Sequence, residues 1–241
     1  MVKLISKIQG ISCVFKVIKG DAYTKLNELQ LESVDVCFTS PGPPGSEPLG
    51  HVGGFNKPET YVFNLATIFD KVRHVLKKTG SLWVQMGDTH DATGSLKLIP
   101  EQFVVRMREK GWIVRSKLIW HREGETYQED ETRFIRDWEY LYWFVLSTDY
   151  YYKEPIGFFK KSVYSFAPET VKDGEFKTIF PEQLVGLALA TTCPPDGLVL
   201  DPFSDSGVTG VVAMRHGHSY IGIEIDGDKV IKQLARLSST K

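Results

Sequence analysis

One stretch of the sequence decides the fold: LVLDPFSDSGVTG, residues 198–210. A short apolar run at 198–200 ends in Asp201 and opens into a turn of small residues, and a helical pattern begins at Gly207. Small residues let backbone amides approach a ligand closely, and a helix N-terminus adds positive partial charge. An ordinary strand-to-helix turn has the same pattern, so the stretch alone leaves its function open. It is not the dinucleotide fingerprint, because the three glycines are absent at that spacing.

A second stretch, SYIGIEID at residues 219–226, follows at the distance of one strand-helix-strand unit. Its strand pattern ends in Glu224, and an acidic residue at this point of such a unit typically receives two ribose hydroxyls. Asp226 suits the N-cap of the helix that follows. Together the two stretches predict a nucleoside-binding half-site with no dedicated phosphate cradle.

Outward from these stretches, apolar strand patterns alternate with helical patterns. The expected strands cover 11–18, 34–39, 81–86, 112–120, 137–147 (an edge hairpin strand), 198–200 and 220–224. The expected helices cover 23–31, 65–76 with Lys77 and Lys78 in the last turn before Gly80, 100–111, 207–215 and 226–237, and another starts at Pro181. This alternation predicts an α/β fold with a mostly parallel sheet, an antiparallel edge hairpin and helices on both faces. In such sheets, ligands bind beyond the carboxyl ends of the strands.

A third stretch, VDVCFTSPGPPGSEPLG at residues 34–50, joins a buried strand to a stiff loop. Thr39, Ser40 and Pro41 follow the apolar run directly, and prolines and glycines dominate the next residues. Proline fixes the backbone and removes a competing hydrogen-bond donor. The loop is predicted to lie at the ligand-binding edge of the sheet.

Composition limits the class of protein. The chain has 241 residues, 42% hydrophobic and 24% charged, which suits one substantial core and a single domain over 1–241. Its net charge is -1, from 29 basic and 30 acidic side chains, so a nucleic-acid partner needs a local basic face. No apolar stretch reaches transmembrane length, no zinc spacing is present, and the cysteines Cys13, Cys37 and Cys193 are expected to be buried reduced thiols. These features predict a cytoplasmic location, no membrane partner and no metal.

Several motifs agree with one family in order and spacing. That family's cofactor loop reads like DPFxGSGTTG, and this chain has DPFSDSGVTG; its catalytic strand ends in TSPPY or a relative, and this chain has TSPGPP. Other similar stretches are GDA at 20–22, GSLWVQMGDTH at 80–90, GWIVRSKLIWHR at 111–122, RDWEYLYWFV at 136–145 and TIFPEQLV at 178–185. The chain thus resembles the DNA amino-methyltransferases that use S-adenosylmethionine, in the permuted beta class that acts on cytosine N4 or adenine N6.

The resemblance implies a Rossmann-like methyltransferase fold with a division of labour along the chain. The catalytic half covers 1–148, the cofactor half covers 179–241, and an irregular insert at 149–178 is a candidate for a small target-recognition region. The implied cofactor residues are Asp201, Phe203, Ser206 and Gly207 on the methionine side, Glu224 at the ribose, Asp21 and Ala22 at the adenine, and Phe180 and Pro181 closing over the cofactor. The implied catalytic residues are Thr39, Ser40 and Pro41, which hold the target amino group, and Pro43.

Two departures from the family pattern stand in its most functional loops. The family has an aromatic residue that stacks on the flipped base, where this chain has Gly42, Pro43 and Pro44; Pro43 or Pro44 supplies an apolar face, or Phe55 folds in. Asp205 stands where the family usually has glycine. Its carboxylate either repels the cofactor's carboxylate or attracts its sulfonium or ammonium, and a residue other than glycine strains the turn.

The predicted function is site-specific DNA methylation of an exocyclic amino group, with the target base flipped out of the duplex. Cytosine N4 is favoured over adenine N6, because serine precedes the proline in the catalytic motif. Candidate DNA-binding residues are Lys160 and Lys161, which lie among aromatic residues, and Arg122, Arg133 and Arg136; a solvated surface loop is the alternative for the lysine segment. The enzyme is expected to be a monomer or homodimer of a prokaryotic or phage-type host, as a restriction partner or an orphan. The alternative is a catalytically weak or inactive homologue that binds DNA or a protein.

Overall fold

The protein is described by a computed structural model that covers residues 2–8, 11–45, 57–124, 132, 134–154, 161–169 and 180–240. The strands are β1 (Val2–Ile8), β2 (Ile11–Lys19), β3 (Val34–Thr39), β4 (Leu76–Met86), β5 (Ile113–Arg122), β6 (Trp138–Val145), β7 (Val163–Phe166), β8 (Leu198–Asp201) and β9 (Ser219–Glu224). The helices are α1 (Ala22–Lys25), α2 (Pro58–Val75), α3 (Ile99–Glu109), α4 (Glu182–Thr192), α5 (Val208–Arg215) and α6 (Gly227–Ser239), with a 3-10 turn η1 (Leu26–Glu28) after α1.

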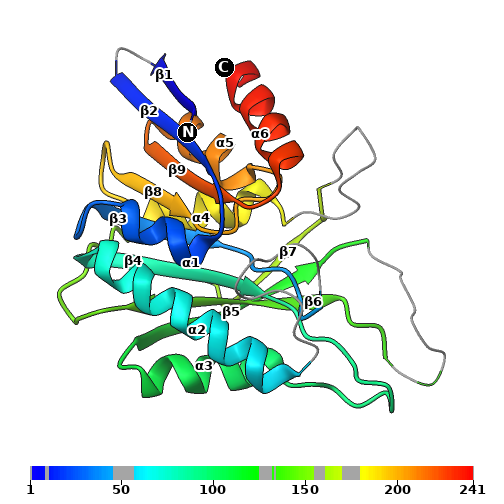
Figure 1. The fold of residues 1–241 in the computed structure, drawn as a ribbon. Helices are drawn as coiled ribbons and strands as arrows, with labels where there is room; N and C mark the ends of the chain where they lie inside the picture. Colours follow the sequence, from blue (N-terminus) through cyan, green and yellow to red (C-terminus); the bar gives the residue numbers. More distant parts are fainter. Residues whose placement is uncertain are drawn as a thin grey trace.

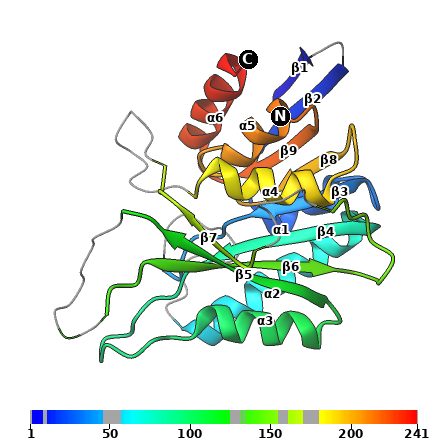
Figure 2. The same ribbon diagram turned by 180° about the vertical axis from the view of Figure 1, so that it is seen from behind.

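The described strands form one sheet in the order β1-β2-β9-β8-β3-β4-β6-β5-β7 (Figures 1 and 2). The five central strands from β2 to β4 run parallel to one another. β6 runs antiparallel to both β4 and β5, and β1 runs antiparallel to β2. The predicted fold class, a mostly parallel α/β sheet with an antiparallel hairpin, is therefore confirmed.

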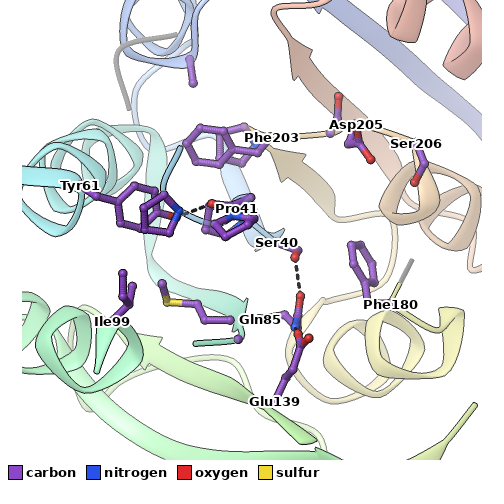
Figure 3. Close-up of a pocket in the computed structure, with 18 of the residues that line it drawn as sticks. Ser40, Pro41, Tyr61, Gln85, Ile99, Glu139, Phe180, Phe203, Asp205 and Ser206 are labelled. Carbon is purple, nitrogen blue, oxygen red and sulfur yellow. Dashed lines mark hydrogen bonds between the residues drawn. The ribbon is translucent and has the colours of Figure 1, made fainter. Parts of the chain in front are cut away.

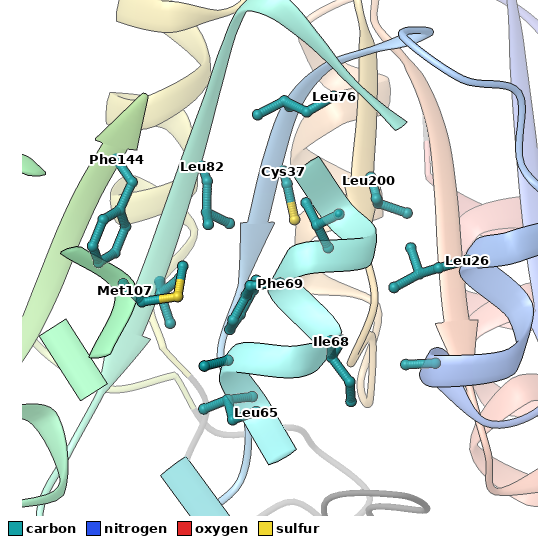
Figure 4. Packing of buried hydrophobic residues seen from close by; sticks show 14 of the residues in the cluster. Leu26, Cys37, Leu65, Ile68, Phe69, Leu76, Leu82, Met107, Phe144 and Leu200 are labelled. Atoms are coloured by element: carbon teal, nitrogen blue, oxygen red, sulfur yellow. The ribbon is translucent and has the colours of Figure 1, made fainter. Parts of the chain in front are cut away.

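Helices cover both faces of this sheet and enclose two apolar cores. One core lies under α1, α2 and α3, where Leu65, Phe69 and Met107 pack on Cys37 and Leu82 of the sheet (Figure 4). The other lies under α4, α5 and α6 and receives the side chains of alternate sheet positions. β3 is buried on both sides, which explains why its sequence is an almost unbroken apolar run. The three cysteines are buried and free, as expected.

The end of α2 differs from the prediction. The helix stops at Val75, and Lys77 and Gly80 belong to β4 instead of the helix terminus. Val34 pairs with Leu76 and Val36 pairs with Ser81, so residues 77–80 bulge out of the ladder. The bulge lets the Lys77 ammonium reach the buried carboxylate of Asp35 at 2.8 Å. Lys77 and Lys78 before Gly80 suggested the end of a helix. In the structure, Lys77 instead neutralises the buried charge of Asp35.

The edge of the antiparallel hairpin also differs from the prediction. β6 was expected at the edge, but it lies between β4 and β5, and its residues 141–145 are buried. The edge belongs to β7, which pairs in parallel with β5 and comes from the segment 149–178 that was expected to be irregular. β1 was not expected as a strand, and the expected helix at 23–31 is the shorter pair α1 and η1. None of the helices that the structure describes is both long enough and apolar enough to span a membrane.

Candidate active site

A cavity of about 420 Å³ opens at the carboxyl ends of the central strands (Figure 3). It lies between the loop after β3 on one side and the loops after β8 and β9 on the other. The residues predicted from sequence that line it are Asp21, Ala22, Ser40, Pro41, Pro43, Arg122, Arg136, Phe180, Phe203, Ser206 and Glu224. The stretches predicted to be catalytic and cofactor-binding, far apart in the sequence, thus share one cavity.

Asp201 and Thr39 lie beneath the cavity and not in its lining. The Asp201 carboxylate accepts hydrogen bonds from the hydroxyls of Thr39 and Thr209, both at 2.7 Å, and from the backbone amide of Phe203 at 3.1 Å. Burial raises the pKa of the Asp201 carboxyl to about 6, although these three hydrogen bonds act in the opposite direction. Asp201 therefore ties the end of β3 to the loop after β8 and to α5. Pro181 and Gly207 also lie outside the lining.

The Glu224 carboxylate lies in the cavity wall at the end of β9. It accepts hydrogen bonds from the backbone amides of Asp205 at 2.8 Å and Asp226 at 2.9 Å. Burial raises the pKa of the Glu224 carboxyl, and the hydrogen bond from the Asp226 amide opposes this rise. Two backbone donors thus fix the carboxylate at the position where the sequence predicted a ribose contact.

Asp205, the departure in the cofactor loop, has a left-handed backbone with φ of 38°. Its carboxylate forms an ion pair with Lys229, which also lines the cavity. Its carbonyl accepts a hydrogen bond of 2.7 Å from Nε2 of Gln233, so α6 holds the strained turn. The negative charge that Asp205 adds to the loop is therefore matched by an ammonium from the same cavity. This pairing has no sign in the sequence, because Lys229 lies on a separate helix.

The loop after β3 is anchored to α2 through Tyr61. The Tyr61 hydroxyl donates a hydrogen bond of 2.6 Å to the carbonyl of Gly42, and its ring is buried. Pro43 and Pro44 both line the cavity, so the apolar face that one of them would offer to the base stays a prediction, and Phe55 lies outside the described residues. Among the described residues, the aromatic side chains in the cavity wall are Tyr61, Trp120, Phe180 and Phe203.

Two cavity residues were missed by the sequence reasoning, Gln85 at the end of β4 and Glu139 at the start of β6. The Ser40 hydroxyl donates to Oε1 of Gln85, and Nε2 of Gln85 donates to Oε2 of Glu139 (Figure 3). The other carboxylate oxygen of Glu139 pairs with the Arg122 guanidinium at 3.0 Å. The sequence did contain a signal that could have identified both residues: each is a polar residue within an apolar strand, and buried polar groups need hydrogen-bond partners.

The predicted basic rim is present in part. Arg122 and Arg136 line the cavity, and Arg136 donates to the backbone carbonyl of Asp88. Lys161 is exposed and lies outside the cavity lining. Arg133 and Lys160 lie outside the described residues.

The fold and the cavity are those expected of a methyltransferase, and comparisons with known proteins agree with this class. M.Cfr9I of Citrobacter freundii, a type II methyltransferase, is 27% identical over 92% of this chain and 87% of its own length. The structure of the cytosine-N4-specific PvuII DNA methyltransferase matches with a TM-score of 0.80 and 19% identity over 92% of this chain and 86% of that one. The structure of TTHA0409 from Thermus thermophilus, described as a DNA modification methylase complexed with S-adenosyl-L-methionine, matches with a TM-score of 0.71 and 20% identity over 93% and 95% of the two chains.

The sequence pattern of the N6/N4 DNA methylases matches residues 34–233, which is most of the chain. The protein belongs to this family of DNA amino-methyltransferases, as its motifs indicated. The family acts on either of two exocyclic amines, so membership alone leaves the choice of base to the site.

Proposed function

We propose that this protein is a DNA methyltransferase that transfers a methyl group from S-adenosylmethionine to an exocyclic amine, with cytosine N4 preferred over adenine N6. The observation that carries the proposal is the cavity that joins Ser40 and Pro41 on one wall to Glu224 and the 202–206 loop on the other. This arrangement supports a methyl donor and an acceptor base bound face to face.

The cofactor-side wall fits S-adenosylmethionine. Glu224 presents a carboxylate, held by two backbone amides, that suits the ribose hydroxyls. Phe180 packs on Phe38 with ring centroids 5.5 Å apart and offers an apolar surface next to the nucleoside. The ion pair between Asp205 and Lys229 leaves the methionine end of the wall near neutral, which suits a ligand that carries both an ammonium and a carboxylate. When bound, the cofactor supplies a methyl group activated by its sulfonium.

The acceptor wall prepares the amine for attack. The lone pair of an exocyclic amine is delocalised into the base, and acceptor oxygens at its two N–H groups favour a pyramidal nitrogen. Ser40 supplies one acceptor oxygen at the strand end, and Pro41 keeps the adjoining backbone rigid. The nitrogen lone pair forms the new bond to the methyl carbon, the electron pair of the broken carbon–sulfur bond stays on sulfur, and the product ammonium releases one proton to water.

The preference for cytosine N4 rests on Ser40, since a serine stands where adenine enzymes more often carry Asp or Asn. The cytosine-N4-specific PvuII enzyme has the same fold, which is in line with this choice. DNA is the proposed partner, and Arg136 at the cavity lining is the proposed contact to its phosphates, whereas Arg122 is engaged by Glu139. The type II relatives make a restriction–modification role the simplest proposal for the host.

The test is methylation of mixed-sequence DNA, followed by digestion to nucleosides and identification by mass. N4-methylcytosine is the expected product. N6-methyladenine alone would keep the amine chemistry and overturn the preference for cytosine, while 5-methylcytosine alone or no product would overturn the proposal. Calorimetric titration with S-adenosylmethionine separates the alternative of an inactive homologue, which predicts no binding at millimolar cofactor.

A further inference from the structure

A chain of polar side chains leads from Ser40 into the protein, and the reaction proposed above does not use most of it. Ser40 donates its hydroxyl hydrogen to Gln85, and Gln85 donates its amide hydrogen to Glu139 (Figure 3). Arg122 also donates to Glu139. Only 3% of the Gln85 surface is exposed, and the side chains of Arg122 and Glu139 are 13% and 19% exposed. The direction of each hydrogen bond is therefore set by protein groups and not by solvent.

Glu139 determines which way the Gln85 amide faces. A primary amide has a donor end and an acceptor end, whereas a carboxylate can only accept. The amide nitrogen of Gln85 must therefore face Glu139, and its oxygen must face Ser40. Ser40 then gives its one hydrogen to that oxygen and keeps its lone pairs for the cavity.

The position of Glu139 is fixed by its surroundings. Its partner across the β5–β6 ladder is Trp120, and Arg122, two residues further along β5, pairs with its Oε1 at 3.0 Å. On the other side lies Gly87, where an added Cβ would come within 3.0 Å of the Glu139 Cδ atom. Glycine at the end of β4 thus lets the backbone pack directly against the carboxylate, which keeps it beside Gln85.

The direction of these hydrogen bonds matters because the target amine presents N–H groups. If Gln85 were reversed, its nitrogen would donate to Ser40, and the Ser40 hydrogen would turn toward the amine. A donor would then face a donor, and the nitrogen lone pair would lose the partner that favours its exposure.

We propose that Glu139 is a positioning residue that acts through Gln85 to keep Ser40 a hydrogen-bond acceptor toward the target amine. This inference rests on the proposed function, since it assumes an amine substrate at Ser40. It assigns no contact between Glu139 and the substrate.

The test begins with Glu139→Gln, which keeps the shape but lets residue 139 donate or accept. The single-turnover rate of methyl transfer is expected to fall about 10-fold or more, below the ~10²-fold typical for full removal of a preorganised partner because Gln85 keeps its native orientation part of the time. The dissociation constants for DNA and S-adenosylmethionine stay within about twofold. Glu109→Gln is the control, because it removes a carboxylate from the exposed ion pair with Arg106 on α3.

A double variant, in which residues 85 and 139 exchange side chains, distinguishes an effect of hydrogen-bond direction from a simple loss of the contact between these two residues. In Gln85→Glu with Glu139→Gln, the carboxylate at 85 accepts from Ser40 and from the amide at 139, so Ser40 is again a donor to its neighbour and an acceptor toward the cavity. The rate is expected to return to within about threefold of wild type at unchanged net charge. In a Ser40→Ala background, Glu139→Gln should have no further effect on the rate, because both changes act through one group.

The outcomes are distinct. A Glu139→Gln rate equal to wild type, or a double exchange as slow as the single change, overturns the inference. Weaker DNA binding with an unchanged single-turnover rate also overturns it, since Glu139 would then belong to the DNA contact surface. If the wild-type protein yields no methylated amine, the proposed function itself fails, and the inference falls with it.

Discussion

Replacing Asp201 with asparagine should flatten the pH dependence of stability. Burial raises the pKa of the Asp201 carboxyl from its ordinary value of 3.8 to about 6, so the folded protein binds a proton there more tightly than the unfolded chain does. Because the folded pKa is the higher one, this group stabilises the fold fully below pH ~4, and the contribution is lost as pH rises through ~6. The full effect corresponds to about 3 kcal/mol, at about 1.4 kcal/mol for each tenfold change in proton affinity.

The part of this free-energy contribution that can be measured most easily lies between pH 7 and pH 5. Linkage predicts that the wild-type protein gains about 1.4 kcal/mol of unfolding free energy over this interval relative to Asp201→Asn, whose side chain does not titrate. Asparagine also keeps an oxygen that can accept from Thr39 and the Phe203 amide, while Thr209 can accept from its nitrogen. The variant is therefore expected to fold.

The assay is urea unfolding of both proteins at intervals between pH 5 and pH 7.5, with the free energy of unfolding extrapolated to water. Asp228→Asn, an exposed change in the first turn of α6, is the matched control and should run parallel to the wild type. If the curves of wild type and Asp201→Asn also run parallel, the raised pKa of Asp201 is wrong. In that case the three hydrogen bonds to the carboxylate offset the effect of its burial on the pKa.

The remaining predictions concern the cavity walls. Ser40→Ala should slow single-turnover methyl transfer by about 10² or more and change stability by only ~1 kcal/mol, with unaltered cofactor affinity in calorimetry; a wild-type rate removes Ser40 from the mechanism. Tyr61→Phe should cost about 1–2 kcal/mol in urea unfolding, because the partly buried Gly42 carbonyl loses its donor, and an unchanged midpoint contradicts the anchoring role. Asp205→Gly should relieve about 1 kcal/mol of backbone strain and shift Lys229 toward the carboxylate of S-adenosylmethionine, so calorimetry should show tighter cofactor binding; weaker binding means that the Asp205 carboxylate holds the cofactor.

The sequence predicted the elements whose pattern is local and strong. β3 lies at the predicted bounds because every residue from 34 to 39 is buried, which leaves a nearly unbroken apolar run. The end of α2 was wrong because Lys77 serves a long-range contact with Asp35 that has no local signature. The edge of the sheet was wrong for a similar reason, since the pairing of β7 with β5 depends on register between distant segments.

The site residues, too, could be predicted only where the sequence signal is local. The ends of β3, β8 and β9 could be located from polar residues that follow apolar runs, and Ser40, Phe203 and Glu224 do line one cavity. Gln85 and Glu139 could not be predicted as site residues, because the role of a polar residue within a strand becomes clear only when its partner across the sheet is known.

The two departures from the family pattern are Asp205 and the missing aromatic residue after Ser40, and each is accompanied by a contact from another part of the chain. A carboxylate at 205 would add an unmatched charge to the cofactor loop, and Lys229 on α6 matches it, while Gln233 holds the strained backbone. The glycine and prolines after Ser40 leave a loop without the expected aromatic, and Tyr61 on α2 holds that loop through the Gly42 carbonyl. Each departure, taken alone, suggested a weakened enzyme. Since a partner in the same cavity accompanies each of them, the departures support an adapted active site more than a decayed one, and this is why an active methyltransferase is the better proposal.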